Sequence, residues 1–416
     1  MTLTDLRPDF GTAPHEGYRR GERGHRQISA ALFAAGVATF ALLYSTQALL
    51  PEFTSSFGVS ADGATWSLSL TTIGLGVTLL FAGSVSEVVG RTRLIHWSVL
   101  ASSLVGVMCA LAPTWSALLG LRLLQGILLA GMPAIAMAYL REELHPSTHA
   151  RAAGLYIGGN ALGGMAGRLL TGVVGEAAGW RWALASVALL GLCCAAVVRI
   201  ALPESRNFEP APHSSRALLA SLVDAFREPG LLALYGIAAC SMGAFVAVYN
   251  SLGFRLTDRP FDLSLGAAGL VFLVYPVGSV SSALAGQLTE SIGRRAVVPL
   301  GCVVTVAGVA ITLSDSLPLV VLGLAVMTAG FFAVHGVASG WVPTRAHAAG
   351  VPAGQAASCY LLCYYVGSSV FGTASGATWS SAGWGGVAGL AVALTAVSGL
   401  LAAYLWRKPS LVPGQR

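Results

Sequence analysis

The sequence predicts an all-α membrane protein with twelve transmembrane helices in two pseudo-symmetric six-helix bundles. Hydrophobic residues make up 55% of the 416 residues and charged residues only 10%, whereas a soluble domain carries about 25% charged residues. Apolar runs long enough to cross a bilayer recur along the whole chain. A short segment rich in glycine and charge also occurs twice, 203 residues apart (286 − 83), which indicates a duplicated bundle.

Each predicted span is an apolar run of roughly 20 residues, the length of helix that crosses a bilayer core of about 30 Å. The twelve runs lie at 28–50, 64–86, 94–112, 115–140, 152–176, 181–201, 231–254, 264–288, 296–314, 317–341, 353–378 and 384–406. The first run is too long for the apolar region of a cleaved signal peptide, so we expect it to remain as a signal-anchor.

The longest interior gap between spans divides the chain into two halves. Residues 202–230 carry four prolines together with acidic and basic residues, a composition typical of an inter-domain linker. The predicted domains are a cytoplasmic tail at 1–27, an N-terminal bundle at 28–201, a cytoplasmic linker at 202–230, a C-terminal bundle at 231–406 and a cytoplasmic tail at 407–416.

The distribution of arginine and lysine predicts the orientation. With the N-terminus inside, 19 of the 24 basic residues lie in cytoplasmic segments, three lie in outer loops (Arg181, Arg255 and Arg259) and two lie within spans. This bias follows the positive-inside rule and places both termini in the cytoplasm. The net charge of +6 is therefore a topology signal that can also attract anionic lipid, and it does not indicate nucleic-acid binding.

The sequence gives no sign of a cofactor. All seven cysteines fall inside apolar runs, without metal-ligand spacing, and are interpreted as small packing residues. The absence of a nucleotide-binding glycine loop argues against an ATP-driven pump.

The repeated segment ends one apolar run and precedes the next in each half. Its copies read Gly83-Ser-Val-Ser-Glu87-Val-Val-Gly90-Arg91-Thr-Arg93 and Gly286-Gln-Leu-Thr-Glu290-Ser-Ile-Gly293-Arg294-Arg295. The segment resembles the loop motif of the major facilitator superfamily, which lies between helices two and three and again between helices eight and nine. The resemblance extends over about residues 28–406 and implies the twelve-helix fold of that superfamily, which can function as a monomer.

Three further segments narrow the resemblance. Gly120-Leu-Arg122-Leu-Leu-Gln125-Gly126 is similar to a motif of proton-coupled efflux members. The glycine-rich stretch from Tyr156 to Arg168 resembles the antiporter motif of span five, but it lacks the usual proline. With Pro203-Glu204-Ser205-Arg206 and Tyr44-Ser-Thr-Gln47, these segments resemble a bacterial drug, sugar and purine-nucleoside efflux group that includes YnfM-like inner-membrane transport proteins. The resemblance implies proton-coupled efflux of a small organic compound by alternating access across the bacterial inner membrane.

The repeated segments are predicted to form gates. Their four glycines would allow close helix contact and sharp turns. Glu87 and Glu290 could cap a neighbouring helix or pair with arginine, and the four arginines could pair with acids of the opposite half. Exposed pairs contribute only about 0–1 kcal/mol each, which suits a latch that opens repeatedly. The first half offers the acids Glu142, Glu143 and Glu204, whereas the corresponding loops of the second half offer Arg345, Arg407 and Lys408 but no acid. We therefore expect the first copy to carry more of the gate energy. The alternative is that these residues are only positive-inside charges and turn glycines.

Arg122 and Arg168 are the sharpest candidates for the pathway, since a charge inside a span costs about 2.5–3.5 kcal/mol and normally faces a cavity or a partner. The alternative is a structural arginine that holds helix four to helix five through backbone carbonyls. The other pathway candidates are polar or aromatic residues on the helices expected to line the cavity: Tyr44, Gln47, Gln125, Asn160, His335, Tyr360 and Tyr364. They predict a pocket for small amphipathic or polar neutral solutes, although each alone could be an ordinary interhelical contact.

Proton coupling has a weaker basis in the sequence. No carboxylate lies in the middle of a span, and His335 is the only histidine well inside one. We expect the carrier to be Glu52 or Glu176, exchanging partners with Arg122 or Arg168. An importer or facilitator could use the same fold, and a membrane sensor without transport is a remote alternative. A membrane enzyme is disfavoured because no clustered catalytic set is present.

Overall fold

The computed structural model describes residues 16–208 and 215–407. The first half contains α1 (Arg23–Tyr44), η1 (Gln47–Leu49), α2 (Leu50–Phe57), α3 (Ala61–Val89), α4 (Arg91–Ala110), α5 (Trp115–Leu129), α6 (Gly131–Glu143), η2 (Pro146–Thr148), α7 (His149–Ala178) and α8 (Trp180–Ala201). The linker contains α9 (Ser215–Arg227). Most of the two predicted tails and part of the linker (1–15, 408–416 and 209–214) lie outside the described residues.

The second half repeats the arrangement of the first. It contains α10 (Pro229–Thr257), α11 (Leu265–Leu270), η3 (Val271–Val274), α12 (Pro276–Ile292), α13 (Arg294–Ile311), α14 (Leu317–Ala348) and α15 (Ala353–Arg407). Ten helical segments of the described chain are long and apolar enough to cross a membrane. Helix α15 is two helices joined at Gly383, whose φ is 57°. Helix α7 is less apolar, but its 30 residues are about 45 Å long. Counting α7 and both parts of α15, the described residues form the twelve predicted crossings.

Three predicted spans are broken helices. Proline has no backbone N–H and cannot continue the hydrogen-bond ladder of a helix. Pro51 and Pro276 each lie at the start of a new helix, after the 3₁₀ turns η1 and η3. The fourth span is interrupted at Ala130, between α5 and α6, three residues before Pro133. The apolar pattern predicted these crossings but not their interruptions.

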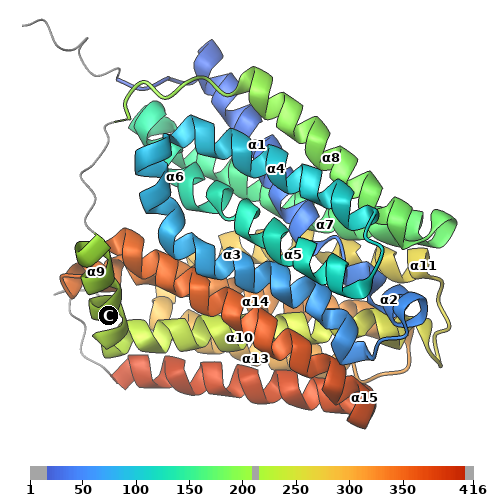
Figure 1. Ribbon diagram of the computed structural model, residues 1–416. Coiled ribbons are helices and arrows are strands. Elements are labelled where there is room, and N and C mark those ends of the chain that lie inside the picture. The colour runs from blue at the N-terminus through green and yellow to red at the C-terminus, as the bar shows by residue number, and fades with distance from the viewer. Residues whose placement is uncertain (1–15, 209–214, 408–416) are drawn as a thin grey trace, which may run out of the picture.

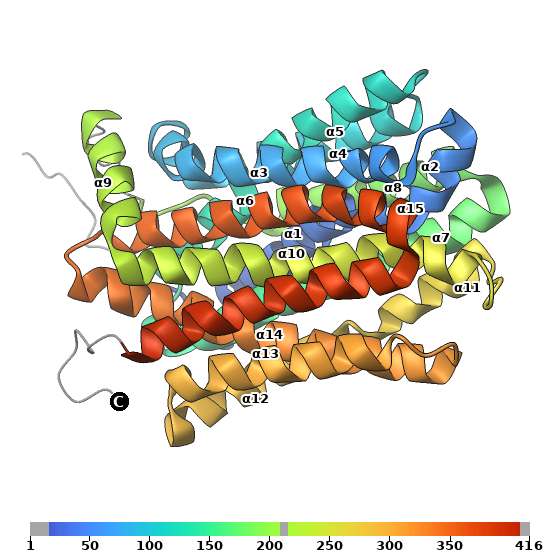
Figure 2. The same ribbon diagram turned by 90° about the horizontal axis from the view of Figure 1, so that it is seen from below.

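The two halves lie against each other as two layers of helices (Figures 1 and 2). Within the halves, α1 packs on α7 and α10 packs on α15. Between the halves, α3 lies beside α15 and α7 beside α11. We call the end of the molecule that carries α2 and α11 the closed end. The end that carries the two repeated segments, to the left in Figure 1, is the hinge end.

Candidate transport pathway between the two halves

Hydroxyl groups join α3 to α15 at the closed end. Ser369 Oγ donates to the carbonyl oxygen of Ser69 (2.9 Å) and lies 2.7 Å from Thr72 Oγ1. Thr373 Oγ1 donates to Ser69 Oγ (2.8 Å). A neutral hydrogen bond contributes only about 0.5–1.5 kcal/mol, so this contact between the halves is of a kind that can break and re-form.

A carboxylate and a pair of glycines join α7 to α11 on the other side. Glu176 Oε2 accepts hydrogen bonds from Ser264 Oγ (2.8 Å) and from the backbone N–H of Gly266 (2.7 Å). A Cβ atom added to Gly172 would lie 3.2 Å from the Cα atom of Gly269. The two backbones therefore approach closely at a point where a side chain would separate them.

The same helix faces that meet at the closed end diverge toward the hinge end. Gly76 and Gly83 lie seven residues apart on one face of α3. A Cβ atom at Gly76 would lie 2.8 Å from Cβ of Tyr365 on α15, but one at Gly83 would have no atom of the described residues within 4 Å. On α7, Gly172 touches the second half, whereas Gly158 on the same face also has open space around it. The interface between the halves is thus tight at one end only.

Arg168 lies at the centre of the closed end, with no exposed surface. Its Nε donates to Gln47 Oε1 (2.5 Å), and its other nitrogens donate to the carbonyl oxygen of Gly164 (2.6 Å) and to Tyr275 Oη (2.9 Å). The guanidinium carbon lies 4.1 Å from the ring centre of Tyr44 and 4.4 Å from that of Tyr275. Within the described residues its partners are neutral, so aromatic rings and dipoles stabilise the buried charge. Tyr275 belongs to the second half, and Arg168 therefore also links the halves.

Gln47 extends this contact to a residue at the equivalent position of the other repeat. Gln47 Nε2 donates to Asn250 Oδ1 (2.7 Å), and Asn250 Nδ2 donates to the carbonyl oxygen of Gly372 (3.3 Å). Positions 47 and 250 differ by 203, the offset of the repeated segments. The two amides therefore occupy matching places in the halves and meet each other at the pseudo-two-fold axis.

Arg122 binds backbone carbonyls, as in the structural alternative, but they belong to other helices than the fifth span. It is 1% exposed and donates to the carbonyl oxygens of Leu42 (3.0 Å), Leu43 (2.8 Å) and Ser67 (3.0 Å). It also bonds to Gln125 Oε1, and Gln125 Nε2 donates to the carbonyl oxygen of Ser102 on α4 (2.9 Å). The pair thus joins α5 to α1, α3 and α4 within the first half, rather than to the helix of the fifth span.

His335, Tyr360 and Tyr364 form one cluster in the second half. His335 Nδ1 and Tyr360 Oη are 3.1 Å apart and share a hydrogen bond. The centre of the His335 ring lies 4.7 Å from the centre of the Tyr364 ring and 5.9 Å from that of the Phe331 ring, to which it is nearly parallel. Tyr364 remains partly exposed, whereas Tyr360 is buried. Ring contacts through Phe331 and Phe245 connect this cluster to Tyr275 and so to the aromatic rings around Arg168.

The remaining pathway candidates lie apart from the two arginines. Glu52 Oε1 accepts from Ser56 Oγ on its own helix (3.2 Å), and Glu176 binds the start of α11. The predicted exchange of carboxylates with Arg122 or Arg168 therefore has no counterpart in this conformation. Asn160 Oδ1 is buried without a hydrogen-bond partner among the described residues.

At the first repeated segment, Arg91 pairs within its own half. Arg91 Nη2 lies 2.7 Å from Glu87 Oε1 and 2.9 Å from Glu142 Oε1, and Nη1 donates to Ser86 Oγ (2.5 Å). The ends of α3 and α6 flank the start of α4, which brings both acids to the arginine. The expected pairing with the opposite half is therefore not formed in this conformation. Arg93 is exposed.

Glu204 is exposed and has no ion-pair partner among the described residues. Glu143 holds that segment instead: its Oε1 accepts from Ser205 Oγ (2.6 Å) and from the backbone N–H of Arg206 (2.8 Å). Of the three acids expected near the first gate, Glu142 pairs with Arg91 and Glu143 binds this segment, whereas Glu204 does neither.

The second repeated segment has the same backbone turn but different partners. Gly90 and Gly293 have φ angles of 92° and 79°, which glycine adopts at little cost. Glu290 is exposed and forms no ion pair with a described residue. Arg294 lies 5.8 Å from the ring centre of Trp341, and Arg295 Nη1 donates to the carbonyl oxygen of Trp406 (3.4 Å).

A separate ion pair stabilises the hinge end of the second half. Glu228 Oε1 lies 2.6 Å from Arg345 Nη2, with both side chains less than 15% exposed, and Glu228 Oε2 accepts from the N–H of Leu231 at the start of α10 (2.6 Å). Burial alone would raise the pKa of Glu228, but the hydrogen bonds from Arg345 and from the start of α10 outweigh it and lower that pKa. Sequence reasoning placed no acid near Arg345, because Glu228 lies 117 residues earlier.

The structure adds residues that the sequence did not single out. Asn250 could have been found, because it lies one repeat offset after Gln47. Tyr275 and Phe272 are isolated aromatics in an apolar run, and no spacing distinguishes them from lipid-facing residues. Arg255 was counted in an outer loop, but it lies within α10, is buried and donates to the carbonyl oxygen of Ser314 (2.7 Å).

Comparisons with known proteins agree with this architecture. The sequence pattern described as Major Facilitator Superfamily matches residues 31–275. The MFS-type transporter YybF of Bacillus subtilis is 39% identical over 390 residues, which cover 94% of this chain and 96% of that protein. The inner membrane transport protein YnfM of Escherichia coli is 38% identical over 388 residues, covering 93% of this chain and 92% of that protein.

Solved structures show the same fold. A bacterial homologue of the human lysosomal transporter Spinster, in an inward-facing and occupied conformation, superposes with a TM-score of 0.73 at 17% identity, covering 92% of this chain and 97% of that chain. The nucleoside transporter NupG superposes with a TM-score of 0.70 at 16% identity, covering 91% of this chain and 99% of that chain. With the family pattern over more than half of the chain and two transporter relatives along nearly all of it, the chain belongs to the major facilitator superfamily.

Proposed function

We propose that this chain is a secondary active transporter that works by alternating access and exports a small organic compound in exchange for protons. The one-ended interface carries the proposal. Faces of α3 and α7 that contact the second half at the closed end have open space beside Gly83 and Gly158 at the hinge end. Rocking the halves about the central contacts would close the hinge end and open the other. A carrier needs two such states, in which opposite ends admit the solute.

The repeated segments have a role in this scheme. Gly83 and Gly286 would provide close contact between the halves when the hinge end closes, although a Cβ atom at either would meet no described atom now. Arg91, held by Glu87 and Glu142, would exchange one of these acids for a partner in the second half. The positive-inside bias supports a hinge end that faces the cytoplasm, so this conformation would receive the solute from inside the cell.

The lining supports an amphipathic solute. His335, Tyr360 and Tyr364 offer hydrogen-bonding groups on aromatic surfaces, as pockets for small organic ligands commonly do. Below them, Arg168 and its partners close the pathway toward the closed end. The protein would act as a monomer, because both halves come from one chain.

Glu176 is the proposed proton-sensitive contact. Its carboxylate accepts two hydrogen bonds across the halves, from Ser264 and Gly266. A protonated carboxyl group accepts such bonds less strongly. Protonation would therefore weaken the closed end and favour the state that is open there, where an exported solute is released.

Transport into inside-out membrane vesicles tests the proposal. Vesicles that contain the chain would receive radiolabelled drugs, nucleosides or sugars, with and without an imposed acidic interior. Export predicts accumulation that depends on the pH gradient, is lost on adding a protonophore, and is reduced in Glu176→Gln. Uptake that equilibrates regardless of the gradient would indicate a facilitator, and accumulation only in right-side-out vesicles would indicate an importer.

A further inference from the structure

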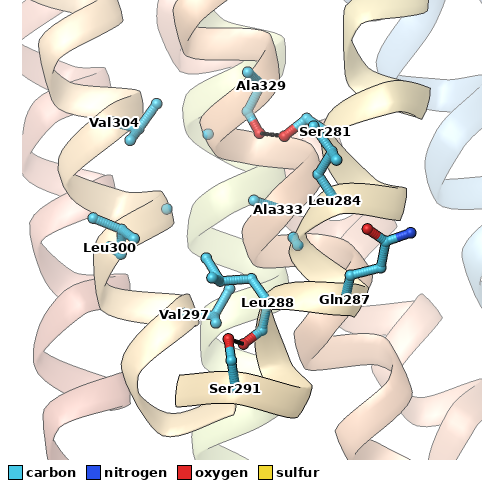
Figure 3. Close-up of a pocket in the computed structure, with 13 residues that line it drawn as sticks. Ser281, Leu284, Gln287, Leu288, Ser291, Val297, Leu300, Val304, Ala329 and Ala333 are labelled. Atoms are coloured by element: carbon cyan, nitrogen blue, oxygen red, sulfur yellow. Dashed lines mark hydrogen bonds between the residues drawn. The ribbon is translucent and has the colours of Figure 1, made fainter. Parts of the chain in front are cut away.

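A groove of about 500 Å³ opens on the second half between α12, α13 and α14. Figure 3 shows Leu284 and Leu288 of α12 on one side, Leu300 and Val304 of α13 on the other, and Ala329 and Ala333 of α14 between them. The groove does not belong to the polar cluster around Arg168. Its lining is mainly aliphatic.

Small residues on α14 create the groove. Ala329, Gly330 and Ala333 leave its floor empty, and Gly330 cannot be enlarged because a Cβ atom there would lie 2.5 Å from the backbone nitrogen of Thr305 on α13. Ser281 Oγ donates to the carbonyl oxygen of Ala329 (2.6 Å) and holds α12 on α14. Helix α12 is thus fixed to the floor and leaves a gap beside α13.

The repeat offset shows that the first half differs at these positions. Leu284 and Leu300 correspond to Phe81 and Trp97. Each counterpart is larger, so the duplicated fold does not itself require a hollow here. The groove is a property of the second half's own side chains.

The groove faces lipid. Leu284 on α12 and Leu300 on α13, which line it, are 59% and 47% exposed, and in a membrane protein such aliphatic faces contact acyl chains. The two lining serines satisfy their hydroxyls locally, Ser281 on Ala329 and Ser291 on the carbonyl oxygen of Leu288 (3.0 Å). The groove therefore offers a long apolar surface with few open polar groups, which suits a hydrocarbon chain.

Positive charge lies at the hinge end of the same groove. Ser291 and Val297, which line it, flank the turn that carries Arg294 and Arg295. Arg294 lies over Trp341 of α14, the helix that forms the floor. These arginines are at the start of α13, where the helix dipole adds positive potential. An anionic group at this point would be held at the depth where a phospholipid head group lies.

We propose that this groove is a binding site for one anionic phospholipid, with an acyl chain between α12 and α13 and its phosphate at Arg294. The occupant follows from the combination of a lipid-facing aliphatic hollow and a cation, Arg294, at its mouth. The site would favour phosphatidylglycerol over phosphatidylcholine of the same chain length, because the second lipid has no net charge.

Photolabelling of the full chain in liposomes tests this site. Phosphatidylglycerol with a diazirine on one acyl chain would be crosslinked and the labelled residues mapped by mass spectrometry, beside a phosphatidylcholine probe with the same chain. We expect concentrated labelling of Leu284, Leu288 and Leu300 by the anionic probe. Equal labelling by both probes, or labelling spread evenly over all lipid-facing helices, would overturn the proposal.

Two variants separate the chain site from the head-group site. Ala333→Leu fills the groove and should reduce the labelling roughly tenfold, as expected from the loss of about two buried methylene groups. Its control is Val303→Leu, which enlarges an exposed side chain that does not line the groove. Arg294→Gln should reduce the labelling by the anionic probe about fivefold, the effect of one arginine at a membrane surface. Equal labelling in the Ala333→Leu and control variants would refute the site, and thermal unfolding in detergent shows whether each variant is folded.

Discussion

Replacing Arg168 with lysine should open the closed end. Arginine reaches Gln47, Gly164 and Tyr275 at once because its donors form a planar fork, whereas a lysine ammonium is a single point charge on a flexible stem. Arg168→Lys keeps the positive charge but cannot keep all of these bonds and the stacking on two tyrosine rings. The bond to Tyr275 and the stacking on that ring are the closest of its contacts that cross between the halves, and the Phe272 ring lies farther away, 5.2 Å from the guanidinium carbon.

The size of the effect follows from those two contacts. A hydrogen bond from a charged donor contributes about 1.5–3 kcal/mol, and a buried cation–π contact about 0.5–2 kcal/mol. Lysine would retain part of the cation–π energy, so the contact between the halves should weaken by about 2–4 kcal/mol. Since 1.4 kcal/mol is a tenfold change in an equilibrium, the closed-end-open state should rise roughly 30- to 700-fold relative to the present one.

Distance measurements between spin labels can detect this shift. The labels would be attached to cysteines at the exposed positions Ser55, on α2, and Asp258, after α10, in a variant without the seven native cysteines. Arg168→Lys should add a longer distance to the distribution at the closed end. The matched control is Arg122→Lys, since Arg122 is equally buried but bonds only within the first half. An unchanged distribution for Arg168→Lys, or an equal shift for both variants, would refute the reasoning.

Three other outcomes are expected. Gly76→Ala should weaken the closed end and lower transport severalfold, because the added Cβ would lie 2.8 Å from the Cβ of Tyr365. Its control is Gly83→Ala, which has open space around it and should leave the spin-label distance at the closed end unchanged. Equal shifts of that distance in both variants would contradict the structure. Glu87→Gln should slow transport in vesicles more than Glu290→Gln, because only the first acid pairs with its arginine here; equal rates would be inconsistent with an unequal latch. Glu228→Gln should lower stability in detergent by about 1–2 kcal/mol through loss of a partly buried charged hydrogen bond. Because the pKa of Glu228 is lowered in the folded state, its contribution to stability is present above the unfolded pKa of about 4.3 and is lost as pH falls through the folded pKa. If Glu228→Gln remained less stable than the parent by the same amount below that pH range, the loss of stability would have another cause.

The fold was predictable because lipid imposes simple rules on the chain. Apolar length identifies a crossing, and the matched segments at 83 and 286 identify the duplication. Helix α7 illustrates the limit of the first rule. Its glycines at 159, 163 and 167 pack on α1 and lower its mean hydropathy, so only its position between neighbouring spans marks it as a crossing.

The candidate site was predictable only in part. Tyr44, Gln47 and Arg168 were singled out separately, and the structure places them in contact. Their partner Tyr275 lies 107 residues beyond Arg168, and no periodicity within one helix indicates a contact between two halves. The interior role of Arg122 was also undecided, because a charge in a span predicts a buried partner without showing whether that partner is a carbonyl or a solute.

The Gln47–Asn250 contact has a consequence for how such a chain can arise. If the two halves descend from one ancestral bundle that paired with its own copy, a side chain on the dimer axis would have faced an identical side chain. Two carboxylates or two guanidinium groups would repel each other there, but an amide carries both a donor and an acceptor and can bond to its twin. The present glutamine and asparagine differ by one methylene group and keep that bond at 2.7 Å. After gene fusion, the amide side chain of either half could then change its length at this position without loss of the hydrogen bond between the two amides.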